Sequence, residues 1–177
     1  MSLPFTRLTR CVYRGHHPRW SFDPESGEGA TRHGGRFNPK GVAALYTSLR
    51  PQTAWLEAQQ SFPFKAQPLT LCAYDIDCTD ILDLTDPAVR NAVATTINDL
   101  GCAWEVMSGS GTTPPSWRLA MRLHVGNAAG IVVQSFAKGA TDRDINVVFW
   151  DWSGTPPHQV VVIDDDARLP RNDRSWQ

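Results

Sequence analysis

The stretch from His33 to Gln60, HGGRFNPKGVAALYTSLRPQTAWLEAQQ, constrains the fold more than any other part of the chain. Its apolar run Val42 to Thr47 is bounded by glycine and serine and predicts a strand. A helix is expected directly afterwards. Pro51 suits the first helical position, because its missing N–H would be unpaired there anyway, and good helix formers continue as far as Pro63. We expect the arginine after the two glycines, the tyrosine of the strand and the glutamate of the helix to converge on one pocket: Arg36, Tyr46 and Glu57.

Glycine and proline divide the rest of the chain into further elements. Apolar or alternating runs predict strands at Cys11–Arg14, Leu69–Asp77 with an extension at Ile81–Leu84, Gly130–Ser135, Ile145–Trp150 and Gln159–Ile163. Helices are expected from Pro87 through Ile97, capped by Thr85 or Asp86, and from Pro115 to Val125, with an apolar face of Trp117, Met121 and His124 or Val125. Two irregular stretches, His16–Gly35 and Gly101–Pro114, are expected to be long surface loops, of the kind that often carry function.

The order of these elements indicates an α+β fold. Strands dominate the second half of the chain, and the regular βαβ alternation of a doubly wound parallel sheet is missing. A length of 177 residues is enough for one sizeable core. We therefore predict one domain over residues 1–177, with its core from about 11 to 163, a C-terminal tail at 164–177, about three helices and a mixed, split or sandwiched sheet.

Composition excludes several classes of protein. Seventeen basic residues against eighteen acidic ones leave a formal net charge of −1, so no field of the whole protein attracts a nucleic-acid backbone. No apolar run approaches the ~20 residues of a membrane-spanning helix, and the first ten residues lack the apolar centre of a secretory signal, which favours the cytoplasm. The cysteines form no CxxC pair, so we expect small buried hydrophobes rather than bridges or metal ligands: Cys11, Cys72, Cys78 and Cys102.

The commonest nucleotide and hydrolase motifs are absent from the sequence. GEGATR, from Gly27 to Arg32, starts like a dinucleotide fingerprint but carries arginine where the third glycine belongs, and there is no Walker lysine motif. HGG at His33 resembles an oxyanion-hole loop, yet no G-x-S-x-G elbow accompanies it. Asp75 and Asp77 would share one face of a strand without the His or Glu cluster that a metal site needs, so no metal is expected.

The remaining polar residues suit a dinucleotide whose glycosidic bond is to be broken. Arg14, at the end of a strand, and Arg36, after Gly-Gly, can each fork onto a phosphate. Tyr46 can stack on a flat ring, with cation–π attraction if that ring is a pyridinium. The carboxylate of Glu57 beside a ribose would stabilise positive charge as a nicotinamide leaves. Each residue also has an ordinary alternative: a surface ion pair for the arginines, core packing for the tyrosine and a solvent-facing position for the glutamate.

Four segments together resemble the RES domain family, which is named after an arginine, a glutamate and a serine. They are YRG at Tyr13–Gly15, GGRFNPKGVAALYTSLRPQTAWLEA at Gly34–Ala58, GIVVQS ending at Ser135, and INVVFW from Ile145. The resemblance covers about residues 11 to 150 and is most specific in the block that ends at Glu57. It implies a toxin of a RES–Xre type toxin–antitoxin pair, with an ADP-ribosyltransferase-like fold that binds NAD and cleaves nicotinamide from ribose.

The resemblance also implies roles for individual residues. Glu57, Arg36 and Ser135 match the residues that act in catalysis, and NAD binding is implied for Arg14, Tyr46, Tyr13 and Asn146. NAD is then a substrate, and no metal is implied. Nicotinamide leaves as a neutral molecule, so the carboxylate pair of a glycosidase is not required.

The acceptor and the partner are implied only as classes. Some members of the family destroy NAD by hydrolysis or phosphorolysis, and at least one type modifies a host protein, a phosphoribosyl pyrophosphate synthetase. A non-catalytic nucleotide-binding module is a third alternative. The partner implied is a small Xre-like helix-turn-helix antitoxin that plugs the pocket. The segment Gly109–Arg118 departs from the pattern of many relatives, which leaves the acceptor side of the site open.

Overall fold

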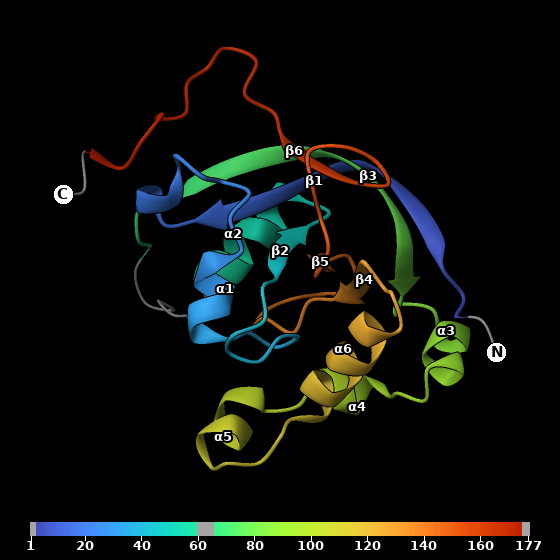
Figure 1. Cartoon of the computed structure of the whole chain (residues 1–177). Coiled ribbons are helices and arrows are strands. Elements are labelled where there is room, and N and C mark those ends of the chain that lie inside the picture. Colours follow the sequence, from blue (N-terminus) through green and yellow to red (C-terminus); the bar gives the residue numbers. More distant parts are fainter. Residues whose placement is uncertain (1–2, 60–65, 175–177) are drawn as a thin grey trace.

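Figure 1 shows the computed structural model of the chain, which describes residues 3–59 and 66–174. The strands within these residues are β1 (Thr6–His16), β2 (Leu45–Ser48), β3 (Thr70–Asp83), β4 (Gly130–Gln134), β5 (Ile145–Phe149) and β6 (His158–Val162). The helices are α1 (Glu28–His33), α2 (Pro51–Gln59), α3 (Pro87–Ala92), α4 (Ile97–Leu100), α5 (Trp104–Gly109) and α6 (Pro115–Val125), together with a 3-10 turn, η1 (Pro18–Trp20).

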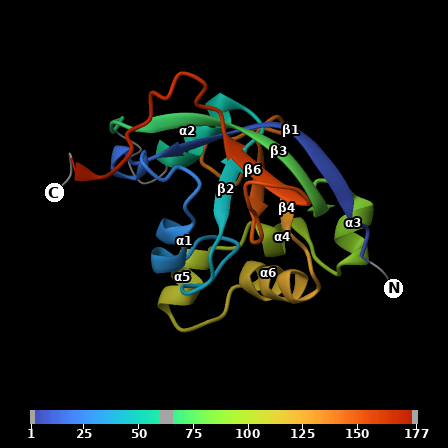
Figure 2. The same ribbon diagram turned by 45° about the horizontal axis from the view of Figure 1, so that its top comes forward.

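The strands form one mixed sheet in the order β1-β2-β5-β4-β3-β6. β3 and β4 are parallel, and the other pairs are antiparallel. β1 pairs with β3 along its whole length and with β2 at Tyr13, so the sheet closes back on itself. The long strands β1 and β3 arch over the shorter ones, and α4 to α6, which connect β3 to β4, lie on the side away from that arch (Figures 1 and 2). The prediction of an α+β fold with a mixed sheet is confirmed.

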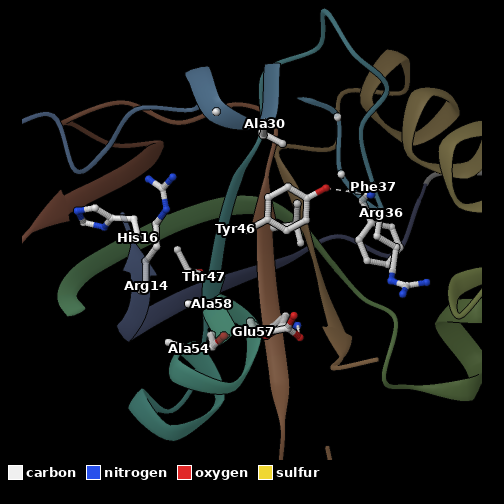
Figure 3. A pocket seen from close by; sticks show the side chains of 18 of the residues that line it. Arg14, His16, Ala30, Arg36, Phe37, Tyr46, Thr47, Ala54, Glu57 and Ala58 are labelled. Carbon is white, nitrogen blue, oxygen red and sulfur yellow. Dashed lines mark hydrogen bonds between the residues drawn. The ribbon is translucent and has the colours of Figure 1, made fainter. Parts of the chain in front are cut away.

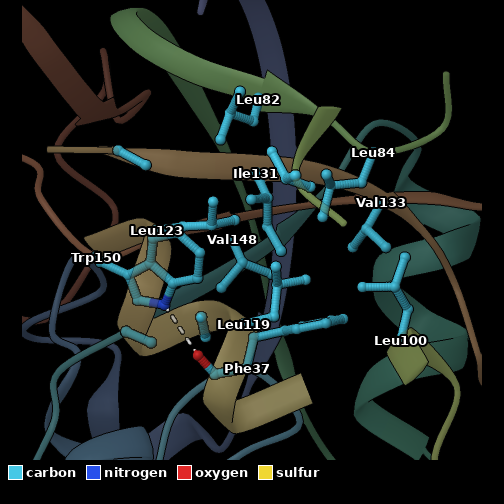
Figure 4. Close-up of a cluster of buried hydrophobic side chains, with 14 residues drawn as sticks. Phe37, Leu82, Leu84, Leu100, Leu119, Leu123, Ile131, Val133, Val148 and Trp150 are labelled. Carbon is cyan, nitrogen blue, oxygen red and sulfur yellow. Dashed lines mark hydrogen bonds between the residues drawn. The ribbon is translucent and has the colours of Figure 1, made fainter. Parts of the chain in front are cut away.

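The central strands β4 and β5 are buried on both faces, which is why their sequences are continuous apolar runs. Ile131 and Val133 face one core, together with Leu119 and Leu123 of α6 (Figure 4). Val132 faces the opposite core, which is formed with β1 and β3. Each such side chain contributes about 1.5–3 kcal/mol when it is fully buried. The two cores therefore hold β4 and β5 rigidly from both sides.

Both stretches expected to be loops contain short helices, so that prediction was wrong. Residues 16–35 include η1 and α1, and residues 101–114 include α5. α1 and α5 are six residues long, and neither N-cap makes a side-chain hydrogen bond to the helix. Helices of this length are not stable alone and depend on tertiary packing. The N-cap side chain that sequence reading relies on is therefore missing from both, although the N–H of Glu28 in α1 donates to Oγ of Ser26, one residue before the N-cap.

β3 is one continuous strand rather than the two predicted at 69–77 and 81–84. Asp80, in the gap between the predicted strands, adopts a left-handed φ of 58°, but pairing with β1 continues on both sides of it. A residue with left-handed φ has the opposite effect near residue 94, where it ends a helix. The helix predicted from Pro87 through Ile97 ends at Ala92, because Ala94 has a φ of 48°, and α4 then begins behind a separate capping box.

Other predicted boundaries and faces need adjustment. The first strand, predicted at Cys11–Arg14, spans Thr6–His16. The strand predicted at Val42–Thr47 begins at Leu45 and ends at Ser48. The helix at Pro51 begins as predicted and is described to Gln59, while its predicted continuation to Pro63 lies outside the described residues. α6 spans the predicted residues, but its buried face differs from the predicted one and consists of Ser116, Leu119, Ala120 and Leu123.

Candidate functional site

Most of the predicted site residues surround one cavity of about 450 Å³ (Figure 3). The cavity wall includes Tyr13, Arg14, Arg36, Tyr46, Glu57 and Asn146. Ser135 is not part of the wall but contacts Glu57 directly. The fold thus brings together side chains from β1, the turn after α1, β2, α2 and β5.

The carboxylate of Glu57 is held by side chains from the sheet. Its Oε1 accepts hydrogen bonds from Oγ of Ser135 and from Nδ2 of Asn146, each at 2.5 Å. Oδ1 of Asn146 accepts a hydrogen bond from Oγ of Ser48 at 2.7 Å. The carboxylate therefore has a fixed position on the cavity wall, defined by β2, β5 and the residue that follows β4.

Two more contacts fix the helix that carries Glu57. Oγ1 of Thr53, one turn earlier on α2, donates to the Asp144 carboxylate at 2.6 Å. This hydrogen bond is the main reason that the pKa of Asp144 lies below its usual range. On the other side, α2 packs against β1 at Gly15, where a Cβ atom would lie only 3.0 Å from Cβ of Ala58. Thr53 and Glu57, four residues apart on α2, are thus bound to Asp144 and Asn146 at the start of β5.

The turn after α1 is organised by Asn38, which is fully buried. Oη of Tyr46 donates to Oδ1 of Asn38 at 2.7 Å and accepts a hydrogen bond from the backbone N–H of Phe37 at 2.9 Å. Nδ2 of Asn38 donates to the carbonyl oxygens of Ala30 and Val42. The side chain of Tyr46 therefore forms part of the cavity wall, and its hydroxyl is both a donor and an acceptor of hydrogen bonds.

Gly35 is required for this arrangement, because a Cβ atom there would lie 2.5 Å from Oη of Tyr46 and 2.8 Å from Oδ1 of Asn38. The carbonyl oxygen of Gly35 accepts a hydrogen bond from Nε1 of Trp117 at 2.7 Å. This bond accounts for the error in the predicted face of α6, since Trp117 reaches sideways to the turn instead of into the core. Nε1 of Trp150 similarly donates to the carbonyl oxygen of Phe37 at 2.9 Å (Figure 4).

Arg36 lies in this turn, between Gly35 and Asn38, and has part of its guanidinium available. Its Nη1 donates to the carbonyl oxygen of Cys102 at 2.7 Å, and its guanidinium carbon lies 5.0 Å from the centre of the Phe136 ring. Burial lowers the pKa of Arg36, and nearby negative groups, Glu57 among them, oppose that effect. An arginine nevertheless stays protonated. Within the described part of the chain only Nη1 forms hydrogen bonds, so Nε and Nη2 retain N–H groups for an anion.

Arg14 has a structural contact that the sequence did not suggest. Its Nη1 donates to the first and third carbonyl oxygens of the segment Pro24–Ser26, at 2.8 and 3.0 Å. Oη of Tyr74 donates to the first carbonyl at 2.7 Å, and Nε1 of Trp152 donates to the middle one at 3.0 Å. Burial lowers the pKa of Arg14. The segment is thus held through three consecutive carbonyl oxygens, and a phosphate-binding role for Arg14 stays a prediction.

His16 is a cavity residue that sequence reading missed. It is 8% exposed and lines the cavity two residues after Arg14. Its two ring nitrogens are the only buried side-chain nitrogen or oxygen atoms without a hydrogen-bond partner in the described residues. Burial, assisted by the charges of Arg14 and His17, lowers the pKa of His16 to about 4, so the imidazole is neutral near pH 7. An unsatisfied buried polar group costs about 1–3 kcal/mol and needs an explanation.

Other cavity residues also escaped the sequence reading. Ser48 and Glu105 line the wall, as do the aromatic residues Trp20, Trp104 and Phe136. Only the turn around Asn38 offered a local signal, because Asn-Pro marks a turn. The others depend on contacts between elements that are distant in the sequence.

Two further structural findings concern metals and membranes. Among residues 3–59 and 66–174, no group of three or more His, Cys, Asp or Glu side chains is placed to hold a metal ion. In the same residues, no helix combines the length and the apolar character needed to cross a bilayer. The cysteines of the described chain form no disulfide; Cys72 and Cys78 are buried, as expected, whereas Cys11 and Cys102 are half-buried.

Comparison with known proteins gives one family. The RES domain model matches residues 7–172. The chain is 34% identical over 137 residues to the NAD(+) phosphorylase MbcT of Mycobacterium tuberculosis strain H37Rv and to that of Mycobacterium bovis, which covers 70% of each chain. It also resembles a chain in the crystal structure of the M. tuberculosis MbcT–MbcA toxin–antitoxin complex, with a TM-score of 0.60, 26% identity and coverage of 90% of this chain and 84% of that one. The fold, the segments around the cavity and these matches together show that the chain belongs to the RES domain family.

Proposed function

We propose that this chain is the toxin of a toxin–antitoxin pair that binds NAD and cleaves its nicotinamide–ribose bond. The observation that carries the proposal is the carboxylate of Glu57, fixed by Ser135 and Asn146 in a cavity that Arg36 and Tyr46 also line. The name of the mycobacterial relatives, NAD(+) phosphorylase, supports the same chemistry. NAD is the substrate in this proposal.

In the proposed reaction, the bond between ribose C1′ and the nicotinamide nitrogen breaks heterolytically. The bonding electrons leave with nicotinamide, which becomes neutral, and the ribose acquires the positive charge. A carboxylate about 4 Å away stabilises that charge by roughly 4 kcal/mol at an effective dielectric near 20, or about three decades of rate. An acceptor then attacks C1′. Water gives ADP-ribose and a proton, and phosphate gives ADP-ribose 1″-phosphate.

The other site residues bind and orient the substrate in this proposal. Arg36 offers Nε and Nη2 to the diphosphate, and the ring of Tyr46, whose hydroxyl is engaged by Asn38, stacks on the nicotinamide. Asn146, Tyr13 and Arg14 complete the NAD site. Ser135 donates its hydroxyl hydrogen to Glu57, so it orients the carboxylate rather than attacking the substrate.

Incubation of the purified protein with NAD tests the reaction. Free nicotinamide should appear, and added phosphate should speed its release and convert the product from ADP-ribose to ADP-ribose 1″-phosphate, both separable by chromatography. NAD labelled in its adenylate phosphate, mixed with a cell extract, tests the alternative of a protein acceptor such as a phosphoribosyl pyrophosphate synthetase. NAD that stays intact at stoichiometric enzyme concentrations would leave only a non-catalytic binding module.

We also infer that the chain is a single RES domain that acts in the cytoplasm and is inhibited by an Xre-like helix-turn-helix antitoxin. The similarity to a toxin–antitoxin complex supports a protein antitoxin as the partner. Expression of the chain alone in a bacterial host should stop growth, and co-expression of its cognate antitoxin should restore growth. Normal growth with the chain expressed alone would contradict the toxin assignment.

A further inference from the structure

The cavity has two halves, each with its own arginine and its own set of neighbouring groups. In one half, the charge of Arg36 interacts with Glu57, Tyr46 and Glu105. In the other half, Arg14 interacts with Tyr74, Cys72 and Asp23, and His16 is influenced by Arg14 and His17. In Figure 3, Arg14 and His16 lie on one side of Tyr46 and Arg36 lies on the other. The carboxylate of Glu57 acts on Arg36 and is not among the groups that act on Arg14 or His16, so we group it with the Arg36 half.

The geometry of a dinucleotide assigns its parts to these halves. The reacting C1′ must lie beside Glu57, and the nicotinamide is bonded to that carbon. The adenosine lies at the far end of the molecule, beyond two phosphates. The half of the cavity that contains Arg14 and His16 is therefore the place for the distal end of the substrate.

We propose that His16 is a recognition residue for the adenine base of the substrate, with one ring nitrogen hydrogen-bonded to the edge of the base and the indole of Trp20 beside it. The proposal rests on the proposed function, because it takes the ligand to be NAD. A neutral imidazole offers one donor and one acceptor without charge, which suits a neutral heteroaromatic base rather than a phosphate. Arg14, two residues earlier on the same strand face, remains for the adjacent phosphate.

The state of His16 fits a residue whose partner is the ligand. It lines the cavity, is 8% exposed and has no hydrogen-bond partner for either nitrogen in the described chain. Both nitrogens are shielded from solvent, so the proposal requires the ring to turn toward the cavity when the base enters. A buried water that satisfies the ring would be the competing explanation, and the experiment separates the two.

Calorimetric titration with ADP-ribose and with nicotinamide mononucleotide tests this assignment, because only the first ligand contains adenine. His16→Leu should weaken ADP-ribose binding about tenfold, the loss expected for one hydrogen bond, and change nicotinamide mononucleotide binding less than about twofold. His16→Gln keeps a donor and an acceptor and should stay within about threefold of the wild type. The matched control is His124→Leu, which should change neither dissociation constant. His124 lies on α6, and its ring packs against that of Trp150.

Nitrogen NMR of ¹⁵N-histidine-labelled wild-type protein provides a second measurement that needs no stable variant. The ring nitrogens of His16, identified by comparison with His16→Gln, should shift on addition of ADP-ribose and not on addition of nicotinamide mononucleotide. Equal losses for both ligands, no loss for either, or unshifted His16 signals would overturn the proposal. Wild-type protein that binds ADP-ribose but never releases nicotinamide would refute the proposed reaction alone, since the binding comparison needs no turnover.

Discussion

The wall of the cavity that carries Tyr46 and the wall that carries His16 differ in how their polar atoms are satisfied. Around Tyr46, the hydroxyl is both donor and acceptor, and Asn38 is hydrogen-bonded through both of its side-chain polar atoms. Around His16, a buried ring has no partner for either nitrogen among the described residues. Both walls line the same cavity, but the polar atoms around Tyr46 are hydrogen-bonded, whereas those of the His16 ring have no partner in the described residues.

This difference separates two requirements of one site. A charge that stabilises a transition state acts best when its position is fixed beforehand, because no reorganisation is then needed at the moment of reaction. The Tyr46 wall and the anchored carboxylate of Glu57 have that property. A recognition group can instead keep an unmet hydrogen-bonding capacity that only the correct ligand satisfies, which raises specificity. The predictions that follow test each wall in turn.

The largest effect is expected from Glu57→Gln, which keeps the shape of the side chain and removes its charge. Nicotinamide release should fall by about three decades, because roughly 4 kcal/mol of transition-state stabilisation is lost. Thermal unfolding should change little. Glu105→Gln removes another carboxylate from the cavity wall and should cost far less. Equal losses in the two variants would mean that the cavity needs negative charge but no particular carboxylate.

The second prediction concerns how the free energy of unfolding depends on pH through His16. The pKa of His16 is about 4 in the folded protein, mainly through burial and then through the charges of Arg14 and His17, and about 6.5 in the unfolded chain. The unfolded chain therefore binds a proton first as pH falls. The contribution of His16 to the free energy of unfolding is fully present above about pH 6.5. It is lost as the pH falls from there to about 4, by on the order of 3 kcal/mol.

Urea unfolding of the wild type and of His16→Gln, measured from pH 7 to pH 4.5, checks this expectation. The variant should lose less stability than the wild type over that range, with His124→Gln as the control histidine. Parallel pH curves for wild type and His16→Gln would show that His16 is not held neutral by its surroundings, and the contrast between the two walls would disappear.

A smaller effect is expected when the anchor of Glu57 is removed. Asn146→Ala deletes a hydrogen bond of 2.5 Å to the carboxylate, and bonds to charged groups are worth about 1.5–3 kcal/mol. kcat should therefore fall about ten- to a hundredfold, while the dissociation constant of ADP-ribose changes much less. Steady-state kinetics and calorimetry measure the two quantities. A loss confined to binding would mean that Asn146 serves NAD binding alone and does not support Glu57.

The last prediction concerns the close packing of Gly35 against the hydrogen-bonded pair Tyr46 and Asn38. Gly35→Ala puts a methyl group where Oη of Tyr46 and Oδ1 of Asn38 lie, so the turn must shift and the free energy of unfolding should fall by about 1–3 kcal/mol. Gly29→Ala is the matched control, because its Cβ meets nothing within 4 Å and alanine favours the helix there. Thermal melts of the two variants give the comparison. Equal stability would show that the turn adapts easily.

The sequence predicted those parts of the fold that are specified locally. The starts of α2, α3 and α6 lie at the predicted prolines, because proline at the first helical position is a local signal. β4 and β5 begin at the predicted residues, because strands buried on both faces are read directly as apolar runs. The short helices α1 and α5 and the unbroken β3 were missed, since each depends on packing against segments far away in the chain.

The candidate site shows the same division. The motif residues of the Gly34–Ala58 block were predicted because they lie close together in one segment of the sequence. His16, Ser48 and Thr53 were not, because their importance comes from partners that are distant in sequence or, for His16, from having none within the described chain. No local pattern distinguishes a histidine with two hydrogen bonds from one with none.

The segment Pro24–Ser26 is attached to the body of the protein by Arg14, Tyr74 and Trp152, and each of them binds a carbonyl oxygen. Every amino acid supplies that oxygen, so these four bonds fix the path of the backbone without specifying side chains. The side chains of Glu25 and Ser26 add one hydrogen bond each, from the N–H groups of Val162 and Glu28. A substitution such as Ser26→Ala would then remove a single hydrogen bond, whereas a change of Arg14 would release two of the three carbonyl oxygens at once.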